Sequence, residues 1–399
     1  MSKKSPQLRF EGFTDDWEQR KLGDVISISS EKNGNQFSRA DVLSVSREAG
    51  VVNQIEYQGR SFAGASIANY RVVHKGDLIY TKSPLKGAPN GIFKTSEAEG
   101  IVSPLYAVYQ SREANAAFVG WLLSNDNFAT HYLYPLVNKG SKNTLLVSDA
   151  DAISGHLSFP NIEEQAKIVS FFTQLDNLIA LHQRKLDLLK EQKKGYLQKM
   201  FPKNGAKVPE LRFAGFADDW EERKLKDIAQ FNPKTVLPDE FEYVDLESVV
   251  GTEMISHRTE SKDQAPSRAQ RLAQKGDVFY QTVRPYQMNN YLYDLPYDNY
   301  VFSTGYAQMR PNIDSYFLLN SVQNKQFVQH VLDRSTGTSY PAINSSDLSN
   351  IEIHVPSKLS EQQKIGAFFQ SIDDTITLHQ RKLDLLKEQK KGFLQKMFV

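Results

Sequence analysis

The sequence predicts an α+β protein: two mixed α/β domains in a pseudo-two-fold arrangement, and two long helices that form an antiparallel coiled coil. Three observations predict this: a duplication that spans the 399-residue chain, a middle in each copy that has diverged, and an apolar helical stripe that has not. A chain of this length exceeds what one ordinary core organises. The expected boundaries are 1–160 and 204–357 for the domains, and 161–203 and 358–399 for the helices.

The duplication is clearest at the start of each copy. Residues 6–25, PQLRFEGFTDDWEQRKLGDV, return as residues 209–228, PELRFAGFADDWEERKLKDI, with 14 of 20 positions identical. Further on, only short echoes survive, such as Lys-Gly-Asp at 75–77 and again at 275–277. A period of about 200 residues is far longer than a solenoid repeat, so the pattern indicates a duplicated domain.

Each copy ends in a predicted long helix. Residues 182–201, HQRKLDLLKEQKKGYLQKMF, return at 379–398 with the single change of Tyr196 to Phe393. Seam positions follow one another at alternating steps of four and three, which is the spacing of a coiled coil. They are Ile168, Phe172, Leu175, Ile179, His182, Leu186, Leu189, Lys193, Tyr196 and Met200, and in the second copy Ile365, Phe369, Ile372, Ile376, His379, Leu383, Leu386, Lys390, Phe393 and Met397.

Two such stripes in one chain can bury each other, and antiparallel pairing is the preferred interpretation. The alternatives are packing of each stripe on its own domain or on another chain, including a homodimer. Asn161 and Glu164 form a candidate cap pair at the start of the first helix. The polar seam residues, His182, His379, Lys193 and Lys390, are expected to set the register.

Seam packing does not explain why outward-facing residues are repeated as well. Identical outer faces would present two equivalent docking sites, so we expect two copies of one partner. Gene conversion between the helix-coding segments is the alternative. Gly195 and Gly392 are also repeated, although each costs roughly 1 kcal/mol inside a helix. The expected partner-binding residues are Gln183, Arg184, Lys185, Lys190, Glu191 and Lys194, with Gln380, Arg381, Lys382, Lys387, Glu388 and Lys391.

Enzyme signatures are missing from the sequence. There is no Cys, no G-x-x-x-x-G-K-[ST] phosphate loop, no H-E-x-x-H, and no [DNS]-P-P-[YFW] tetrapeptide of the kind an adenine methyltransferase uses. We therefore expect no catalytic residue and no metal site. The N-terminus lacks a signal peptide and no run of 18 apolar residues occurs, which favours a cytoplasmic protein.

Taken together, the repeated head LRFEGFTDDWEQRKLGDV, the tail of each globular part, and the HQRKLDLLKEQKKG helix resemble a type I restriction–modification specificity subunit. The tails run from Gly140 to Ile168 and from Thr336 to Ile365. The resemblance implies two target-recognition domains, each reading one half of a split DNA site, with the helices as spacer. It also implies two docked methyltransferase subunits, and translocase–nuclease subunits for cleavage. S-adenosylmethionine, ATP and magnesium would belong to those partners, and the complex would lie at the bacterial nucleoid when bound to DNA.

Loops that combine cations with small polar residues are the expected DNA contacts, because phosphates need Lys or Arg and base edges need polar groups. In the first domain these are Lys82, Lys86, Lys139, Ser141, Lys142 and Asn143. In the second domain they are Arg268, Arg271, Gln281, Arg284, Tyr286, Thr336, Thr338, Ser339 and Tyr340. Two alternatives remain at this point: a protein-interaction scaffold on the same coiled coil, and a fused methyltransferase–specificity enzyme, which the missing motifs disfavour.

Overall fold

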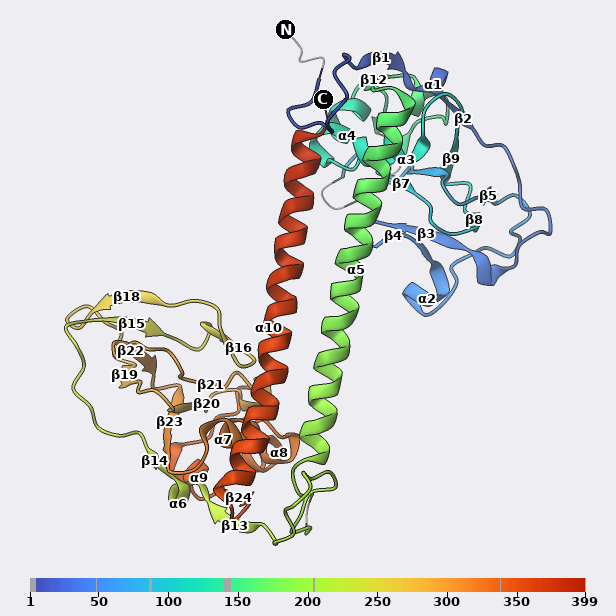
Figure 1. Ribbon diagram of the computed structural model, residues 1–399. Helices are drawn as coiled ribbons and strands as arrows, with labels where there is room; N and C mark the ends of the chain where they lie inside the picture. Colours follow the sequence, from blue (N-terminus) through green and yellow to red (C-terminus); the bar gives the residue numbers. More distant parts are fainter. Residues whose placement is uncertain are drawn as a thin grey trace. The chain divides into compact units, whose positions relative to one another are not determined.

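The computed structural model describes residues 5–47, 49–85, 88–139, 145–203, 205–337 and 339–398. The chain divides into two compact units, Met1–His182 with Lys382–Val399 (unit 1) and Gln183–Arg381 (unit 2). Each unit holds one globular domain and parts of both long helices, α5 (Ile162–Lys199) and α10 (Leu359–Lys396) (Figure 1). Among the described residues, no helix has the length and apolarity needed to span a bilayer.

Unit 1 is built on a four-stranded antiparallel sheet in the order β2-β9-β6-β7, which helix α3 covers. The sheet strands are β2 (Ile26–Ile28), β9 (Tyr106–Ser111), β6 (Leu78–Thr81) and β7 (Phe93–Thr95). Paired strands are β1 (Glu18–Lys21) with β12 (His156–Phe159), β3 (Leu43–Ser46) with β4 (Gly50–Asn53), β5 (Arg71–Val73) with β8 (Gly100–Val102), and β10 (Asn138–Lys139) with β11 (Leu145–Leu146). The shorter helices are α1 (Leu22–Val25), η1 (Arg39–Asp41), α2 (Gln54–Gln58), α3 (Ala116–Leu122), α4 (Asp126–Leu133) and η2 (Asp151–Ile153).

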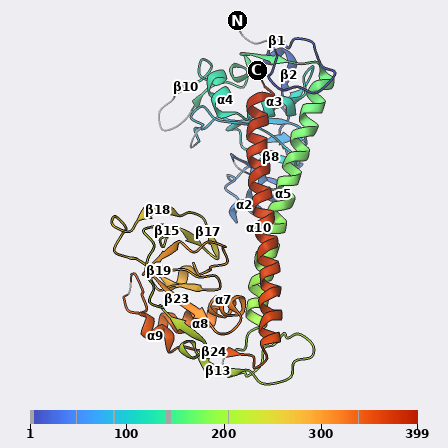
Figure 2. The same cartoon turned by 60° about the vertical axis from the view of Figure 1, so that its left-hand side comes forward.

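Unit 2 repeats this plan. Its antiparallel sheet has the order β14-β23-β20-β21, with β14 (Ala229–Phe231), β23 (Tyr306–Pro311), β20 (Val278–Gln281) and β21 (Tyr291–Leu292). A second, mixed sheet has the order β18-β15-β22-β19, with β18 (Arg258–Ser261), β15 (Glu240–Val244), β22 (Tyr300–Ser303) and β19 (Ala269–Leu272). The remaining pairs are β13 (Glu221–Lys224) with β24 (Glu352–Val355) and β16 (Val249–Val250) with β17 (Glu253–Met254). The shorter helices are α6 (Leu225–Ile228), η3 (Pro285–Gln287), α7 (Ser315–Val322), α8 (Lys325–Asp333) and α9 (Ser345–Ser349), and α7 and α8 lie beside the long helices (Figure 2).

The main sheets of the two units therefore share one topology although their sequences have diverged. The likeness extends to the second layer. Strands β15 and β22 of unit 2 pair in parallel, and in unit 1 a parallel bridge joins Val42 to Ile101 at the corresponding place. The prediction of a duplicated mixed α/β domain is confirmed, and the divergence lies in side chains and loops, not in the order of the strands.

In both units the helices pair in opposite directions. In unit 1 the first half of α5 packs against the end of α10, and Lys390 forms an ion pair with Asp176. In unit 2 the first half of α10 packs against the end of α5, where Lys193 Nζ lies 2.6 Å from Asp373 Oδ1. These are equivalent pairs, since the helix repeat has an offset of 197 residues. The two seam lysines therefore fix one register twice, as predicted.

The end of each long helix completes the core of the unit it reaches. In unit 1, Phe398 at the end of the chain packs against Trp17 and Phe118, and Leu8 N donates to Lys396 O at 2.9 Å. In unit 2, the equivalent Phe201 packs against Trp220 and Phe317. Each domain therefore takes its last core residues from the helix of the other repeat.

The repeated head is held to the start of the following helix by a buried ion pair. Arg9 Nε lies 2.7 Å from Glu164 Oε1, and the equivalent Arg212 Nε lies 2.7 Å from Glu361 Oε1. The expected cap at Asn161 is present, because its side chain accepts from Glu164 N at 2.9 Å. The reciprocal cap by the Glu164 side chain was wrong: that carboxylate accepts both hydrogen bonds of the Arg9 guanidinium instead.

The repeated Lys-Gly-Asp sequence is a structural motif whose aspartate has different partners in the two units. Gly76 and Gly276 have φ angles of +93° and +95°, a conformation that glycine adopts without strain. Asp277 is buried and accepts two hydrogen bonds from the Arg310 guanidinium, at 2.8 and 2.9 Å. Asp77 is also buried but forms no ion pair with Lys or Arg among the described residues, and burial raises its pKa.

Candidate nucleic-acid interface

In unit 2, three segments that the sequence singled out converge at one end of the main sheet, where its strands run into loops. Strand β20 ends there, and Thr282 N donates to Gly305 O at 2.9 Å while Ile343 N donates to Thr282 O at 3.0 Å. Thr304 N donates to Arg268 O at 2.8 Å, which adds the segment before β19. We call residues 267–271, 282–290, 303–305, 335–337 and 339–345 the loop surface. The structure thus joins the segments around Arg268, Arg284 and Tyr340, which lie far apart in the sequence.

Most of the predicted side chains on the loop surface are accessible. Tyr286 and Tyr340 are 50% and 63% exposed. Arg284 is partly exposed, and its guanidinium carbon lies 4.4 Å from the centre of the Tyr340 ring. Exposed polar residues surround them, namely Arg268, Thr336 and Ser339.

The prediction that Gln281 contacts DNA has to be corrected. Its side chain is only 2% exposed, and its Nε2 donates to Val283 O at 2.7 Å and to Gln287 Oε1 at 2.8 Å. Gln281 N in turn donates to Asn290 Oδ1, and Asn290 is buried as well. The buried Gln281 side chain therefore supports the 282–290 loop through hydrogen bonds and is not accessible to a ligand.

Backbone strain also gathers at this surface. Among the described residues, Asn232, Arg284 and Met288 are the only non-glycine residues with φ in the left-handed region, at 45°, 54° and 57°. Arg284 and Met288 flank the 3-10 turn η3, and the Asn232 side chain donates to Ser345 Oγ at 3.0 Å. Such conformations cost of order 1 kcal/mol or more each, and they collect at ligand-binding sites.

The charge of unit 2 is distributed unevenly between its arginines. Arg212, Arg258 and Arg310 form ion pairs at 2.7, 2.7 and 2.8 Å. By contrast, Arg268, Arg271 and Arg284 form no ion pair with any described residue. All three belong to the loop surface, which therefore carries uncompensated positive charge of the kind that a phosphate backbone requires. Arg334, just before this surface, and Arg184 and Arg381 on the long helices also form no ion pair with a described residue.

Arg271 is half-buried, and its Nε has no hydrogen-bond partner within the described part of the chain. Burial lowers its pKa.

Sequence reasoning missed the counterpart of Arg271 in unit 1, Arg71, although extending the Lys-Gly-Asp match four residues back aligns the two arginines. It also missed the loop after β14, where Lys234 and Val236 are exposed, the latter at 84%. No repeat or motif marks that loop.

In unit 1, Lys82 is held in an ion pair within the domain. Lys82 and Arg71 both form ion pairs with Asp149, and the Lys82 side chain is only 19% exposed. Lys82 therefore ties the loop after β6 to the loop before η2, and its contact with DNA stays a prediction. Lys86, Ser141, Lys142, Asn143 and Thr338 lie outside the described residues. Lys139 belongs to β10, which pairs with β11, and its side chain is likewise outside the description.

The residues predicted to bind a partner lie on the two long helices. Two of them are partly exposed, Gln183 and Gln380. The others are exposed: Arg184, Lys185, Lys190, Glu191 and Lys194 on α5, and Arg381, Lys382, Lys387, Glu388 and Lys391 on α10. Large apolar side chains are exposed among them, since Leu181 and Leu188 are 56% and 52% exposed and Leu378 and Leu385 are 65% and 57% exposed.

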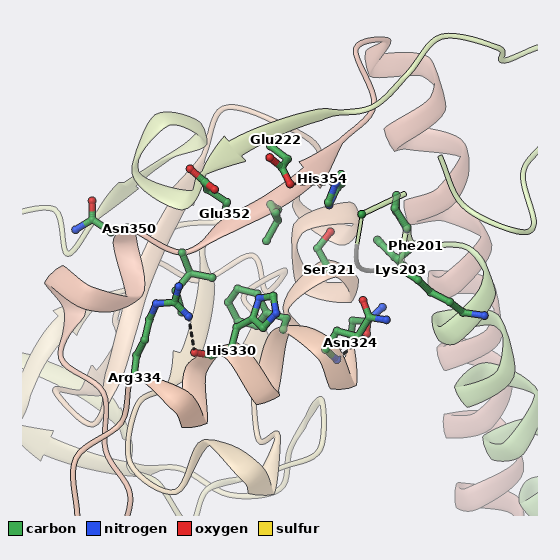
Figure 3. A pocket seen from close by; sticks show the side chains of 16 residues that line it. Phe201, Lys203, Glu222, Ser321, Asn324, His330, Arg334, Asn350, Glu352 and His354 are labelled. Carbon is green, nitrogen blue, oxygen red and sulfur yellow. Dashed lines mark hydrogen bonds and ion pairs between the residues drawn. The ribbon is translucent and has the colours of Figure 1, made fainter. Parts of the chain in front are cut away.

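A cavity of about 350 Å³ opens elsewhere in unit 2, between α8, β24 and the segment that follows α5 (Figure 3). Its floor is apolar, with Phe327 and Ile353, and its rim mixes cations with carboxylates. Glu222 and His354 face each other there, with Oε1 and Nε2 3.4 Å apart. None of the residues predicted to contact DNA lines this cavity, and its mixed charge matches neither a polyanion nor a cation.

Comparison with known proteins gives the family. The type I restriction modification DNA specificity domain matches twice, at residues 14–191 and 217–388. The chain is 25% identical to the type I restriction enzyme HindI specificity subunit of Haemophilus influenzae, over 45% of this chain and 41% of that protein. It is 21% identical to the putative type I restriction enzyme MjaX specificity subunit of Methanocaldococcus jannaschii, over 95% and 92% of the two chains.

A crystal structure described as the type I restriction-modification system S subunit from M. genitalium shares the fold. Its TM-score is 0.64, its identity 12%, and the match covers 99% of both chains. The two family matches coincide with the two copies of the duplicated unit and together span most of the sequence. The resemblance read from the head, tail and helix motifs is thereby confirmed, and this chain belongs to the type I restriction–modification DNA specificity family.

Proposed function

We propose that this chain gives a type I restriction–modification complex its DNA specificity, each unit binding one half of a two-part site. The observation that carries the proposal is the loop surface of unit 2. There, uncompensated arginines, exposed tyrosines and strained backbone lie together at the end of strand β20. In this role the chain contributes recognition, while catalysis and its cofactors belong to partner subunits.

The duplicated topology supports reading by both units. Each unit brings the loop after strand β6 or β20 to the tail segment, by the ion pair of Lys82 with Asp149 in unit 1 and by main-chain bonds around Thr282 in unit 2. The same scaffold thus displays two different sets of side chains. Different half-sites for the two units follow from this, because base-edge contacts depend on side-chain identity and loop geometry.

Domain exchange tests this assignment. Residues 26–160 are replaced by the corresponding segment of another family member, and the methylated bases are mapped in cells that also express the methyltransferase subunit. We expect one half of the motif to change while the other half and the gap stay the same. An exchange of residues 229–350 serves as the reciprocal control and should change the other half. Changes in both halves after either exchange would contradict the proposal.

We further propose that two methyltransferase subunits dock on the long helices, one on each copy of a stripe. The stripe consists of Leu188 and Gly195 on α5, which lie in unit 2, and of Leu385 and Gly392 on α10, which lie in unit 1. Seven-residue spacing places each set along one line of its helix. Exposed leucines beside the glycine give an apolar strip with a notch, and the exposed cations beside it suit an acidic partner surface.

The two glycines provide a quantitative test of docking. A Cβ added at Gly195 or Gly392 would meet no atom within 4 Å, so alanine is expected to stabilise the free chain by about 1 kcal/mol per site. The same methyl groups would fill the notch against the partner. We expect Gly195→Ala or Gly392→Ala alone to leave one methyltransferase subunit bound, and the double variant to bind none, in sedimentation analysis of the complex.

Gln192→Ala and Gln389→Ala, at exposed positions of the same helices, are the matched controls and should keep two bound copies. If the double glycine variant still bound two methyltransferase subunits at undiminished affinity, docking on this stripe would be excluded.

A further inference from the structure

We infer that Arg284 reads a guanine in the half-site bound by unit 2, through the major groove, with Tyr340 holding its guanidinium in position. The inference rests on the proposed function and goes further, since it assigns one base type to one residue. Three features of Arg284 carry it: its rigid presentation, its free hydrogen-bonding groups and its contact with an aromatic ring.

The backbone around Arg284 is fixed from several directions. Arg284 N donates to Pro341 O at 2.8 Å, and Gln287 N donates to Arg284 O at 3.0 Å. Beneath the loop, the buried side chains of Gln281 and Gln323 donate to Val283 O and Met288 O. The left-handed conformation of Arg284 is therefore imposed by its surroundings.

A strained conformation at an arginine needs an explanation, because glycine or asparagine would occupy the left-handed region at lower cost. Positioning of the side chain supplies one. From φ 54° and ψ 55° the side chain leaves the loop where the Tyr340 ring lies 4.4 Å beneath the guanidinium carbon. A cation over an aromatic face is stabilised by about 0.5–1 kcal/mol at an exposed site, and the contact limits rotation of the planar group.

The free groups of Arg284 match guanine specifically. No described carboxylate pairs with it, so its N–H donors are available in the fixed fork of the guanidinium. In the major groove guanine presents two acceptors, N7 and O6, side by side, and the planar fork of arginine, unlike the single ammonium of lysine, can meet both in a fixed geometry. A phosphate contact needs only a cation, which a flexible lysine supplies without strain. An oriented, stacked arginine is instead suited to a base edge.

The test uses the full chain assembled with its methyltransferase subunit. Binding to oligonucleotides that carry each single-base change in the mapped motif is measured for the wild type, Arg284→Lys and Arg284→Gly. We expect both variants to bind the intact site roughly 10- to 100-fold more weakly and to lose discrimination at one G·C pair of one half-site. Arg223→Ala, which removes an ion-paired arginine elsewhere in unit 2, should leave discrimination unchanged.

Two results of these binding measurements would overturn the inference. One is retention of full discrimination at every G·C pair by both variants. The other is equal weakening on all sequences with a smaller dependence of affinity on salt, which marks a phosphate contact. Misfolding cannot produce the expected result, because glycine relieves the strain at position 284, and the melting temperature of Arg284→Gly is expected to equal or exceed that of the wild type.

The positioning role of Tyr340 is tested separately. Tyr340→Phe keeps the ring and is expected to keep discrimination at the same G·C pair, whereas Tyr340→Leu is expected to reduce it. Equal behaviour of the two variants would remove Tyr340 from the inference. The proposed function fails on a different result, the absence of any two-part motif for the wild-type complex, so the two failures are distinguishable.

Discussion

A chain shortened to residues 1–203 is expected to assemble as a dimer and to direct methylation of an inverted-repeat site. The reason lies in unit 1, whose core is completed by the end of α10, where Phe393 contacts Phe171 and Phe398 contacts Phe172. Residues 182–201 carry the same side chains with one change, so the end of α5 in one copy can take that place in the other. Reciprocal exchange of an identical element forms a dimer at little cost in free energy, because each copy keeps the contacts of the single chain.

Sedimentation and methylation mapping check this result. The expected particle contains two copies of residues 1–203, and the expected motif has two identical halves in opposite orientation. Phe201→Asp in the shortened chain is the control, because it places a charge where the partly buried Phe398 packs against Trp17 and Phe118 in the 399-residue chain, and the dimer should be lost. A folded monomer of residues 1–203 would show that unit 1 does not need the second helix end.

Replacing the aspartate of the Lys-Gly-Asp motif is expected to have opposite effects in the two units. Asp277→Asn removes the charge that faces the Arg310 guanidinium and leaves a largely buried cation without its counter-ion. We expect unit 2 to lose about 3 kcal/mol of stability. Asp77 faces no such cation, so Asp77→Asn should stabilise unit 1 at pH 7, by on the order of 1 kcal/mol.

The pH dependence of unit 1 follows from the same carboxyl. Burial raises the pKa of Asp77 in the folded state, so folding favours the protonated form. The stability that protonation gives is fully present below the ordinary pKa of 3.8 and is lost as the pH rises through the raised value. Asp77→Asn should abolish this loss.

Hydrogen exchange of peptides from β6 and β20, measured between pH 4 and 8, reports on each unit separately. Because exchange chemistry itself depends on pH, each variant is compared with the wild type at the same pH. Destabilisation of unit 1 by Asp77→Asn at pH 7, or an unchanged unit 2 in Asp277→Asn, would contradict the assigned partners.

The long helices were predictable because their signals are local and periodic. A seam sustained over many turns, repeated almost without change, leaves one face to bury, and Lys193 and Lys390 at seam positions indicated a role in register. The ion pairs with Asp373 and Asp176 were not predictable, because they depend on the exact alignment of two antiparallel helices.

For the side chains proposed to contact DNA, the sequence predicted only the segments on which they lie. The sequence located the loops around Arg284 and Tyr340, since both are polar segments at homologous places in the repeat. It could not distinguish Gln281, at the end of a wholly buried strand, from Arg284 three residues later. Nor could it foresee that Asp149 neutralises Lys82, because residues 67 positions apart meet only through the fold.

The most direct test of the account is a map of methylated bases in cells that express the methyltransferase subunit with and without this chain. We expect methylation at one two-part motif with a fixed gap, present only when the chain is expressed. Methylation that is identical in its absence, or that follows a single uninterrupted motif, would contradict it.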